Sequence, residues 1–223
     1  MKYKVVEKFT SINGEGNAAG QLAVFIRFAG CNLKCSYCDT QWANDVNNVE
    51  YEEMSADDIF NYIKETGINN VTLTGGEPLL QDGIAQLLSH LSMDNSLRVE
   101  IETNGSIDLS DFLNITPNRP VFTMDYKLGT SNMEHSMVIS NLELLKPQDT
   151  VKFVAGSIRD LESANKLIEK FHLIDKCAVH LSPVFDKINM QTIVDFMKQN
   201  KMNGVRLQPQ LHKFIWHPSM RGV

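Results

Sequence analysis

The sequence predicts an α/β fold, an incomplete TIM-like parallel β/α barrel with about six core strands and few helices. Short β-branched runs alternate with segments of helical periodicity, which is typical of parallel strands joined by helical crossovers. Most of these runs stop at Gly, Pro, Asn or Ser, and chemically distinctive residues follow the stops. The pattern offers far fewer helices than strands, so we expect a splayed sheet rather than a complete eightfold barrel.

The expected strands follow one another along the whole chain. A first run, residues 3–9, is expected to add an edge strand. The next strand, residues 24–28, leads directly into a loop rich in cysteine. In parallel barrels the carboxyl ends of the strands build the active site, so the residues that follow each strand are the candidates for function. The remaining strands are expected at 71–74, 98–103, 121–124, 150–154, 179–181 and 205–207.

Four helices are expected between these strands. Ser55 followed by Asp58 resembles a capping box and predicts a helix from there to about residue 65. Residues 83–91 place apolar side chains at helical spacing. The other two helices are expected from Ser157 or Asp160 through Phe171, and over residues 188–200.

Length and composition indicate one domain over residues 1–223. A chain of 223 residues with 43% hydrophobic residues supports one substantial core, and no Pro/Gly/Ser-rich linker divides it. The net charge of −6 argues against nucleic acid as a partner, which needs a cationic surface. No long apolar run or signal-peptide pattern points to a membrane or to export. Free thiols fit a reducing compartment, so we expect a cytoplasmic protein.

The most informative motif is Cys31, Cys35 and Cys38, a C-x3-C-x2-C spacing. Three thiolates on one loop can hold three corners of a cubane iron–sulfur cluster and leave the fourth iron free for a small-molecule ligand. Zinc usually takes four ligands in pairs and no second pair is near, although a distant His or Cys177 could complete a zinc site. A disulfide framework is disfavoured, because thiols this close would strain a bridge and Cys177 is far away.

The cysteine motif, with Tyr37 inside it and Gly75-Gly76-Glu77-Pro78 farther on, resembles the radical S-adenosylmethionine (SAM) superfamily. This resemblance implies a [4Fe-4S] cluster on the three cysteines, with S-adenosyl-L-methionine bound to the unique iron. It also implies that one-electron reduction yields a 5′-deoxyadenosyl radical that takes a hydrogen atom from the substrate. The protein fold would be the incomplete barrel of this superfamily. A glycyl-radical enzyme activating protein is the alternative within the superfamily, and a cluster-bearing redox module is the non-enzymatic alternative.

Four further stretches resemble the 7-carboxy-7-deazaguanine synthase family, and the resemblance covers essentially the whole chain. They are residues 11–16, 25–28, 38–40 and 210–214. The resemblance implies a lyase that converts 6-carboxy-5,6,7,8-tetrahydropterin to 7-carboxy-7-deazaguanine with release of ammonia, in 7-deazapurine and queuosine biosynthesis. It also implies Mg²⁺, a homodimer, and a flavodoxin or ferredoxin-type reductant. No catalytic side chain is implied beyond the cofactor-borne radical.

The superfamily resemblance places S-adenosyl-L-methionine at the strand ends. Gly75 and Gly76 permit close backbone approach, although two glycines also make a plain turn. Lys127 is expected to pair with the methionine carboxylate unless it is a surface lysine, and Asp125 stands where many relatives have serine. The set expected at the cofactor is Tyr37, Gly75, Gly76, Glu77, Asn104, Asp125, Lys127 and Ser182, of which Asn104 and Ser182 also occur in ordinary turn sequences.

The family resemblance places the pterin beside Arg27, which interrupts an otherwise apolar strand. Burying a guanidinium is costly unless an anion meets it, and its planar fork suits the substrate carboxylate. A strand-edge position or a structural acid is the alternative for Arg27, and a flexible surface loop is the alternative for Glu15. The set expected at the substrate is Ile12, Gly14, Glu15, Gly16, Arg27, Thr74, Glu102, His212 and Pro218.

Thr40 is expected to ligate Mg²⁺ beside the substrate carboxylate. Mg²⁺ prefers oxygen ligands and retains waters, so one hydroxyl with substrate and waters is reasonable. The alternative is that Thr40 caps a helix after the cysteine loop. The chain continues past Pro218 to Val223, so we assign no terminal carboxylate to the site.

Overall fold

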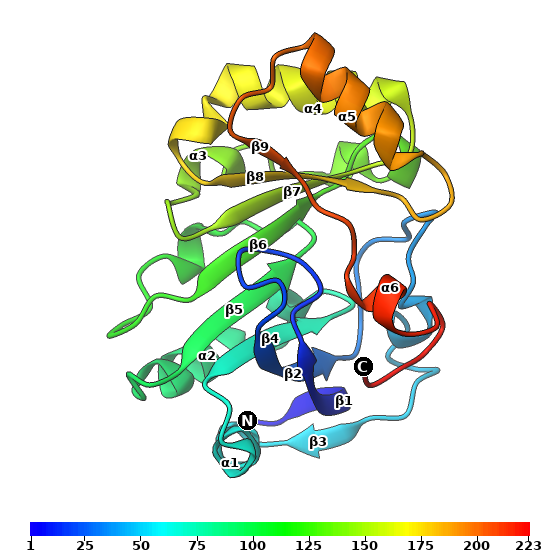
Figure 1. The fold of residues 1–223 in the computed structure, drawn as a ribbon. Helices are drawn as coiled ribbons and strands as arrows, with labels where there is room; N and C mark the ends of the chain where they lie inside the picture. Colours follow the sequence, from blue (N-terminus) through cyan, green and yellow to red (C-terminus); the bar gives the residue numbers. More distant parts are fainter.

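The strands form one open sheet. The computed structural model describes residues 1–223 and orders nine strands as β3-β1-β2-β4-β5-β6-β7-β8-β9. Every neighbouring pair from β2 to β9 is parallel, whereas β1 is antiparallel to both β2 and β3. Because β3 and β9 lie at opposite ends and do not pair, the barrel is incomplete, as predicted (Figure 1). The strands are β1 (Tyr3–Ile12), β2 (Leu22–Phe28), β3 (Glu52–Met54), β4 (Asn70–Gly75), β5 (Arg98–Thr103), β6 (Val121–Tyr126), β7 (Thr150–Ala155), β8 (Ala178–Pro183) and β9 (Val205–Leu207).

One continuous apolar core runs through the sheet. It joins 39 buried residues from the first strand to the last, with Phe28, Phe122 and Phe153 among the largest. All residues of β4 and β7 are buried, which is expected where a parallel sheet is covered on its outer face and its inner face lines a cavity. The central strands are therefore rigid supports for the residues at their ends.

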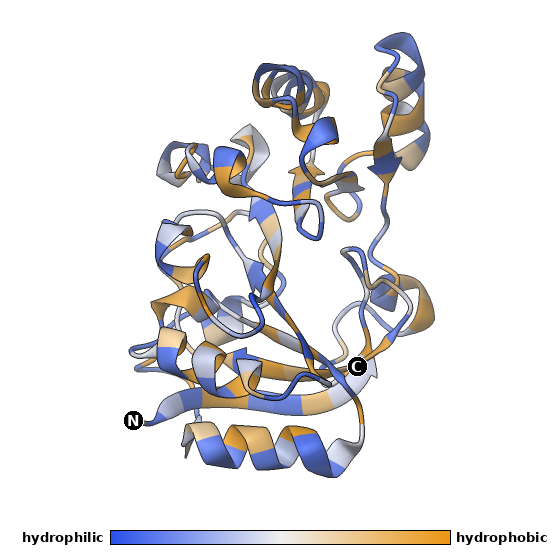
Figure 2. Ribbon diagram, turned by 90° about the vertical axis from the view of Figure 1, so that its left-hand side faces the viewer, coloured by the Kyte–Doolittle hydropathy of each residue, from blue (hydrophilic) through white to orange (hydrophobic).

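The four predicted helices are confirmed. They are α1 (Ala56–Thr66), α2 (Ile84–Ser92), α4 (Ile158–Phe171) and α5 (Met190–Gln199), and Figure 2 shows helices along the outside of the curved sheet. Ser55 and Asp58 form the predicted capping box, and Ser157 rather than Asp160 caps α4. Two single-turn helices, α3 (Asn141–Leu144) and α6 (His212–Ile215), were not predicted. No helix has both the length and the apolar character that crossing a bilayer requires.

The edge position predicted for residues 3–9 is wrong. Strand β3 pairs with the start of β1, so β1 lies between two strands instead of at the edge. The sequence carries little sign of β3, because it has three residues and its two glutamates are exposed. A short charged strand is a common way to protect a sheet edge from further pairing.

Candidate active site

The carboxyl ends of the parallel strands open into one cavity of about 660 Å³, large enough for small-molecule ligands. The loop after β1, the cysteine loop and the C-terminal segment complete its walls (Figure 1). Most of the predicted site residues lie together here. They are Ile12, Gly14, Glu15, Arg27, Cys31, Cys35, Tyr37, Cys38, Thr40, Thr74, Gly75, Gly76, Glu102, Asn104, Asp125, Lys127, His212 and Pro218.

Glu77 is one of three predicted residues that do not line the cavity. Its side chain is fully buried, and its carboxylate accepts hydrogen bonds from the Leu79 and Asn104 N–H groups and from the Thr103 hydroxyl. Burial raises the pKa of Glu77 to about 7, although these hydrogen bonds act in the opposite direction. In this structure Glu77 ties the end of β4 to the end of β5, and its contact with the cofactor stays a prediction.

Gly16 and Ser182 also lie behind the cavity wall. The backbone N–H and C=O of Gly16 both bond to the side chain of Gln208, at 2.7 and 2.9 Å, which fixes the loop after β1. Ser182 is buried inside β8 and its hydroxyl has no hydrogen-bond partner. The turn that the sequence allowed at Ser182 is therefore wrong, and its contact with the cofactor stays a prediction.

The cysteine loop follows β2 directly. Cys31, Cys35 and Cys38 are free thiols on the cavity wall, whereas Cys177 is buried elsewhere and its thiol donates to the carbonyl of Leu173. No three His, Cys, Asp or Glu side chains gather closely enough to hold a single metal ion. A cubane cluster does not need such a group, because it holds its thiolates at separate corners. Burial raises the pKa of Cys35 to about 11, so loading a metal centre there releases protons.

The glycines at the end of β4 bring backbone against the cysteine loop. A Cβ on Gly76 would lie 2.2 Å from the carbonyl oxygen of Gly30 and 2.7 Å from Cβ of Cys31. The N–H of Glu77 donates to that same carbonyl at 2.8 Å. A plain turn needs no such approach, so glycine is required here for the close packing of the end of β4 against the cysteine loop. Three thiols, a side-chain-free backbone and nearby polar groups are a donor set that fits a cluster with S-adenosyl-L-methionine.

Gly76→Ala is expected to destabilise the fold and the cysteine loop together. The added methyl meets backbone, which cannot swing aside, so we expect a loss of about 1–3 kcal/mol in the free energy of unfolding. Urea unfolding and iron content after anaerobic reconstitution measure the two effects. Gly129→Ala is the matched control, because a Cβ there makes only ordinary contacts of 3.5 and 3.6 Å. Equal stability and equal iron content in both variants would contradict the close packing.

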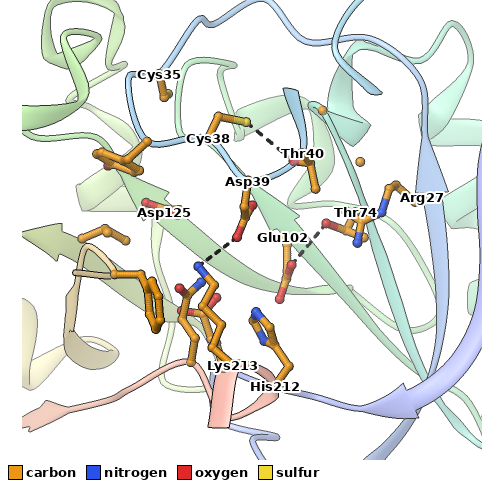
Figure 3. A pocket seen from close by; sticks show the side chains of 18 of the residues that line it. Arg27, Cys35, Cys38, Asp39, Thr40, Thr74, Glu102, Asp125, His212 and Lys213 are labelled. Carbon is orange, nitrogen blue, oxygen red and sulfur yellow. Dashed lines mark hydrogen bonds and ion pairs between the residues drawn. The ribbon is translucent and has the colours of Figure 1, made fainter. Parts of the chain in front are cut away.

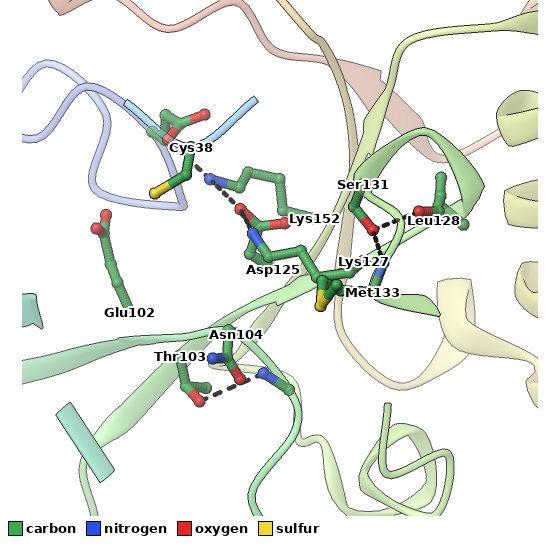
Figure 4. A network of polar contacts seen from close by, with 12 residues as sticks. Cys38, Glu102, Thr103, Asn104, Asp125, Lys127, Leu128, Ser131, Met133 and Lys152 are labelled. Carbon is green, nitrogen blue, oxygen red and sulfur yellow. Dashed lines mark hydrogen bonds and ion pairs between the residues drawn. The ribbon is translucent and has the colours of Figure 1, made fainter. Parts of the chain in front are cut away.

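Four charged groups form a row of ion pairs across the cavity wall. Nζ of Lys127 lies 3.0 Å from Oδ2 of Asp125, and Nζ of Lys152 lies 3.3 Å from the same oxygen (Figure 4). Nζ of Lys152 also lies 2.7 Å from Oε2 of Glu15. Burial acts to raise the pKa of Asp125, but the two ammonium groups outweigh it and hold this pKa below its ordinary value. Lys127 and Glu15 are mostly buried, so a surface lysine and a flexible surface loop are both wrong interpretations.

Arg27 forms an ion pair with Glu7 and also lines the cavity. Its Nε donates to Oε2 of Glu7 on the neighbouring strand, at 3.0 Å. The alternative of a structural acid is thus correct for one edge of the guanidinium. The terminal nitrogens of Arg27 make no hydrogen bond to the protein, and the residue lines the cavity. The ion pair with Glu7 therefore orients the guanidinium of Arg27, and its two terminal nitrogens are free to bind a ligand.

Glu102 and Thr74 lie side by side on the cavity wall, with the Thr74 hydroxyl donating to Oε2 of Glu102 at 3.2 Å (Figure 3). Burial raises the pKa of Glu102 to about 7, partly offset by Lys152. His212 packs against Gly14, where a Cβ would come within 2.4 Å of Nδ1. Burial lowers the pKa of His212, so its imidazole is neutral at pH 7.

Thr40 lies beside the cysteine loop. Its hydroxyl is 3.6 Å from Sγ of Cys38. It is the N-cap residue of a single 3-10 turn, Gln41–Ala43, but its side chain makes no capping hydrogen bond. Thr40 therefore occupies a capping position, as the alternative predicted, but its hydroxyl does not cap the turn.

Several residues that line the cavity were not predicted from the sequence. Lys152 was missed although it is a lone lysine in an otherwise apolar strand, the same signal that singled out Arg27. Asp39 and Lys213 form an ion pair of 3.2 Å across the cavity (Figure 3). The last residues of the chain, 218–223, also line the wall. Pro218 was predicted, and Asp39 and Lys213 lie in stretches that carry the family resemblance, but the sequence does not show that these two residues form a pair.

The chain resembles known proteins first at the level of an enzyme superfamily. The model of the radical SAM superfamily matches residues 25–199, which include the cysteine loop and the parallel strands β4 to β8. The crystal structure of QueE from Escherichia coli superposes with a TM-score of 0.73 over 94% of each chain, at 24% identity. That likeness supports the fold. The chain is a radical SAM protein.

Individual relatives of similar sequence identify the family to which the chain belongs within this superfamily. The chain is 60% identical to the 7-carboxy-7-deazaguanine synthase of Clostridium acetobutylicum over 223 residues, all of both chains. It is 35% identical to the enzyme of that name from Chlorobaculum tepidum, over 98% of this chain and 96% of the relative. The enzyme of that name from Leptospira interrogans is 33% identical over 100% of this chain and 99% of the relative. Within the superfamily, the chain belongs to the 7-carboxy-7-deazaguanine synthase family.

Proposed function

We propose that the protein is a radical SAM lyase that converts 6-carboxy-5,6,7,8-tetrahydropterin to 7-carboxy-7-deazaguanine with release of ammonia, in 7-deazapurine biosynthesis. The observation that carries the proposal is that one cavity contains the cysteine loop, an arginine oriented by Glu7 and the half-buried carboxylate of Glu102. Full-length identity of 60% to a 7-carboxy-7-deazaguanine synthase supports the same substrate and product. The product feeds the synthesis of 7-deazapurines such as queuosine.

The chain's own residues bind and orient two ligands. When bound, the cluster and S-adenosyl-L-methionine supply a carbon radical able to remove a hydrogen atom, which side chains cannot do. Cys31, Cys35 and Cys38 hold the cluster. S-adenosyl-L-methionine would lie against the glycines of β4 and Lys127. Glu77 and Ser182 are further predicted contacts of this cofactor. Tyr37, Asn104 and Asp125 complete the cofactor set.

The other end of the cavity suits the pterin. Arg27 offers its free fork to the substrate carboxylate. Glu102 and Glu15 accept hydrogen bonds from the N–H groups of the pyrimidine ring, and Thr74 lies beside Glu102. His212, which packs against Gly14, contacts the pterin ring. The rest of the predicted substrate set lies at the end of β1, in the loop after it and in the C-terminal segment. These residues are Ile12, Gly14, Gly16 and Pro218.

The test of this function is an anaerobic assay of the cluster-loaded protein with S-adenosyl-L-methionine, dithionite and the pterin. Appearance of 7-carboxy-7-deazaguanine and ammonia in equal amounts is expected. Formation of 5′-deoxyadenosine with the pterin left unchanged would contradict the proposal. That result would favour the glycyl-radical activating alternative, which the charged residues of the cavity do not support.

Pterin binding should strengthen as pH rises through about 7. The pKa of Glu102 is raised to about 7 by burial, so the carboxyl is protonated below that pH and becomes a full acceptor above it. Affinity for 6-carboxypterin, measured by fluorescence, is expected to increase several-fold between about pH 6 and about pH 7.5. Glu102→Gln should bind more weakly and lose this dependence. A variant that kept the same pH profile would remove Glu102 from the site.

Mg²⁺ bound by Thr40 is part of the proposal. Its support is a hydroxyl on the cavity wall that makes no capping hydrogen bond, in a cavity that also contains the free fork of Arg27. Thr40→Ala is expected to lower the apparent affinity for Mg²⁺ about tenfold or more, with iron content unchanged. The measurement is the reaction rate against Mg²⁺ concentration. A variant whose rate responds to Mg²⁺ as the parent's does would contradict the assignment.

The proposed cellular setting follows from this chemistry. A homodimer and a flavodoxin or ferredoxin-type reductant are the partners proposed for such an enzyme. The four free thiols fit a reducing cytoplasm. Gel filtration of the anaerobic protein, and activity with each reductant in place of dithionite, test these partners.

A further inference from the structure

Lys152 is a buried cation in the middle of β7. Its side chain is 7% exposed and lines the cavity. Its Nζ lies 2.7 Å from Oε2 of Glu15 and 3.3 Å from Oδ2 of Asp125. An ammonium group has three donors, so one donor remains beyond these two contacts. Lys152 thus joins two carboxylates from segments that are distant in the chain.

Each of these two carboxylates keeps one oxygen without a partner. Oε1 of Glu15 and Oδ1 of Asp125 are buried and accept no hydrogen bond. Leaving a buried carboxylate oxygen without a donor is costly. Because both residues line the cavity, a ligand with N–H or O–H donors would complete them. The pyrimidine ring of a pterin carries N–H donors, and the ribose of S-adenosyl-L-methionine carries O–H donors.

The two carboxylates come from different segments of the cavity wall. Glu15 lies on the loop after β1, next to Gly14 and its contact with His212. Asp125 ends β6 and pairs with Lys127, whose ammonium lies 5.8 Å from the ring centre of Tyr37 in the cysteine loop. Lys152 reaches both carboxylates from strand β7, and Figure 4 shows it beside Asp125.

We propose that Lys152 is a positioning residue, which holds Glu15 and Asp125 so that their free oxygens accept donors from the pterin and from S-adenosyl-L-methionine respectively. The proposal rests on the proposed function. It also accounts for the carboxylate of Asp125 on the cavity wall. Two ammonium groups, from Lys127 and Lys152, balance its charge in a place where a carboxylate alone would be unfavourable.

Lys152→Met tests the proposal in the cluster-loaded protein. The probes are 6-carboxypterin, followed by fluorescence, and S-adenosylhomocysteine, followed by calorimetry, so that no turnover is needed. Both affinities are expected to fall about tenfold or more, because both acceptors lose their orientation. Affinities equal to the parent's would overturn the proposal.

Arg119→Met is the matched control. Arg119 pairs with buried Asp149 at 2.8 Å, just before β6 and β7, at the opposite end of the two strands that carry Asp125 and Lys152. This variant also breaks a buried ion pair, so it should lower the unfolding temperature and leave both affinities unchanged. If Lys152→Met loses no more affinity than Arg119→Met, the role of Lys152 is merely structural and the proposal fails.

A double variant keeps the test decisive if Lys152→Met does not fold. In Glu15→Gln/Lys152→Met the carboxylate left without its cation is also removed, which relieves the main cost of breaking a buried pair. If Lys152 acts through Glu15, pterin affinity in the double variant equals that of Glu15→Gln within about twofold. Losses that multiply would overturn the proposal. Failure of the parent protein to bind 6-carboxypterin would instead overturn the proposed function.

Discussion

Cys35→Ala is expected to abolish cleavage of S-adenosyl-L-methionine and formation of product. With two thiolates left on the loop, the cluster loses one of its three protein corners, and no other cysteine on the cavity wall replaces it. The measurement is 5′-deoxyadenosine formed after dithionite reduction, together with iron and sulfide content after anaerobic reconstitution. Both should fall to background or near it, and the protein should still fold.

Cys177→Ala is the matched control for this prediction. Cys177 is a buried thiol that contacts the carbonyl of Leu173 and lies outside the cavity. It should behave as a small hydrophobic residue, so its replacement is expected to leave iron content and cleavage unchanged. Loss of the cluster in Cys177→Ala, or its retention with full activity in Cys35→Ala, would contradict the three-cysteine assignment.

Arg27→Ala should raise KM for the pterin about a hundredfold or more. A bidentate contact between a guanidinium and a carboxylate contributes two charge-assisted hydrogen bonds, each contributing about 1.5–3 kcal/mol. Iron content and uncoupled cleavage of S-adenosyl-L-methionine should stay at the parent's level, because the hydrogen bond of Arg27 goes to Glu7 and not to the cysteine loop. Steady-state kinetics over a wide range of pterin concentration measures the effect.

Two variants distinguish the contribution of the Arg27 guanidinium from that of Glu7, which orients it. Glu7→Gln removes the charge that orients Nε of Arg27 but leaves the guanidinium, so its KM should rise less than in Arg27→Ala. Arg27→Lys keeps the positive charge and loses the planar fork, so it should recover only part of the affinity. Parent-like kinetics in Arg27→Ala would show that the guanidinium serves Glu7 alone.

The sequence is most informative where function depends on local spacing. The three cysteines lie within one loop, and the glycines of β4 follow a strand whose apolar run is plain, so the sequence alone predicts that both lie at the active site. The four main helices are recognisable from their periodicity and caps. The single-turn helices and β3 are too short to carry a period, and tertiary pairing decides them.

The charged network could not be predicted, because it joins distant segments. Lys152 and Glu15 are 137 residues apart, and neither position shows which partner the other will meet. Arg27 illustrates the same limit: the sequence predicts its burial and its need for an anion, but its pair with Glu7 depends on the register of β1 against β2. The aspartate at position 125 is explained only by the two lysines beside it in the fold.

The central claim is that three cysteines hold a cluster whose fourth iron is open to S-adenosyl-L-methionine. Electron paramagnetic resonance of the dithionite-reduced protein, recorded with and without S-adenosyl-L-methionine, tests this claim most directly. We expect a reduced [4Fe-4S] signal that changes when S-adenosyl-L-methionine is added and is absent from Cys35→Ala. A signal that the cofactor leaves unchanged, or one that survives in Cys35→Ala, would contradict it.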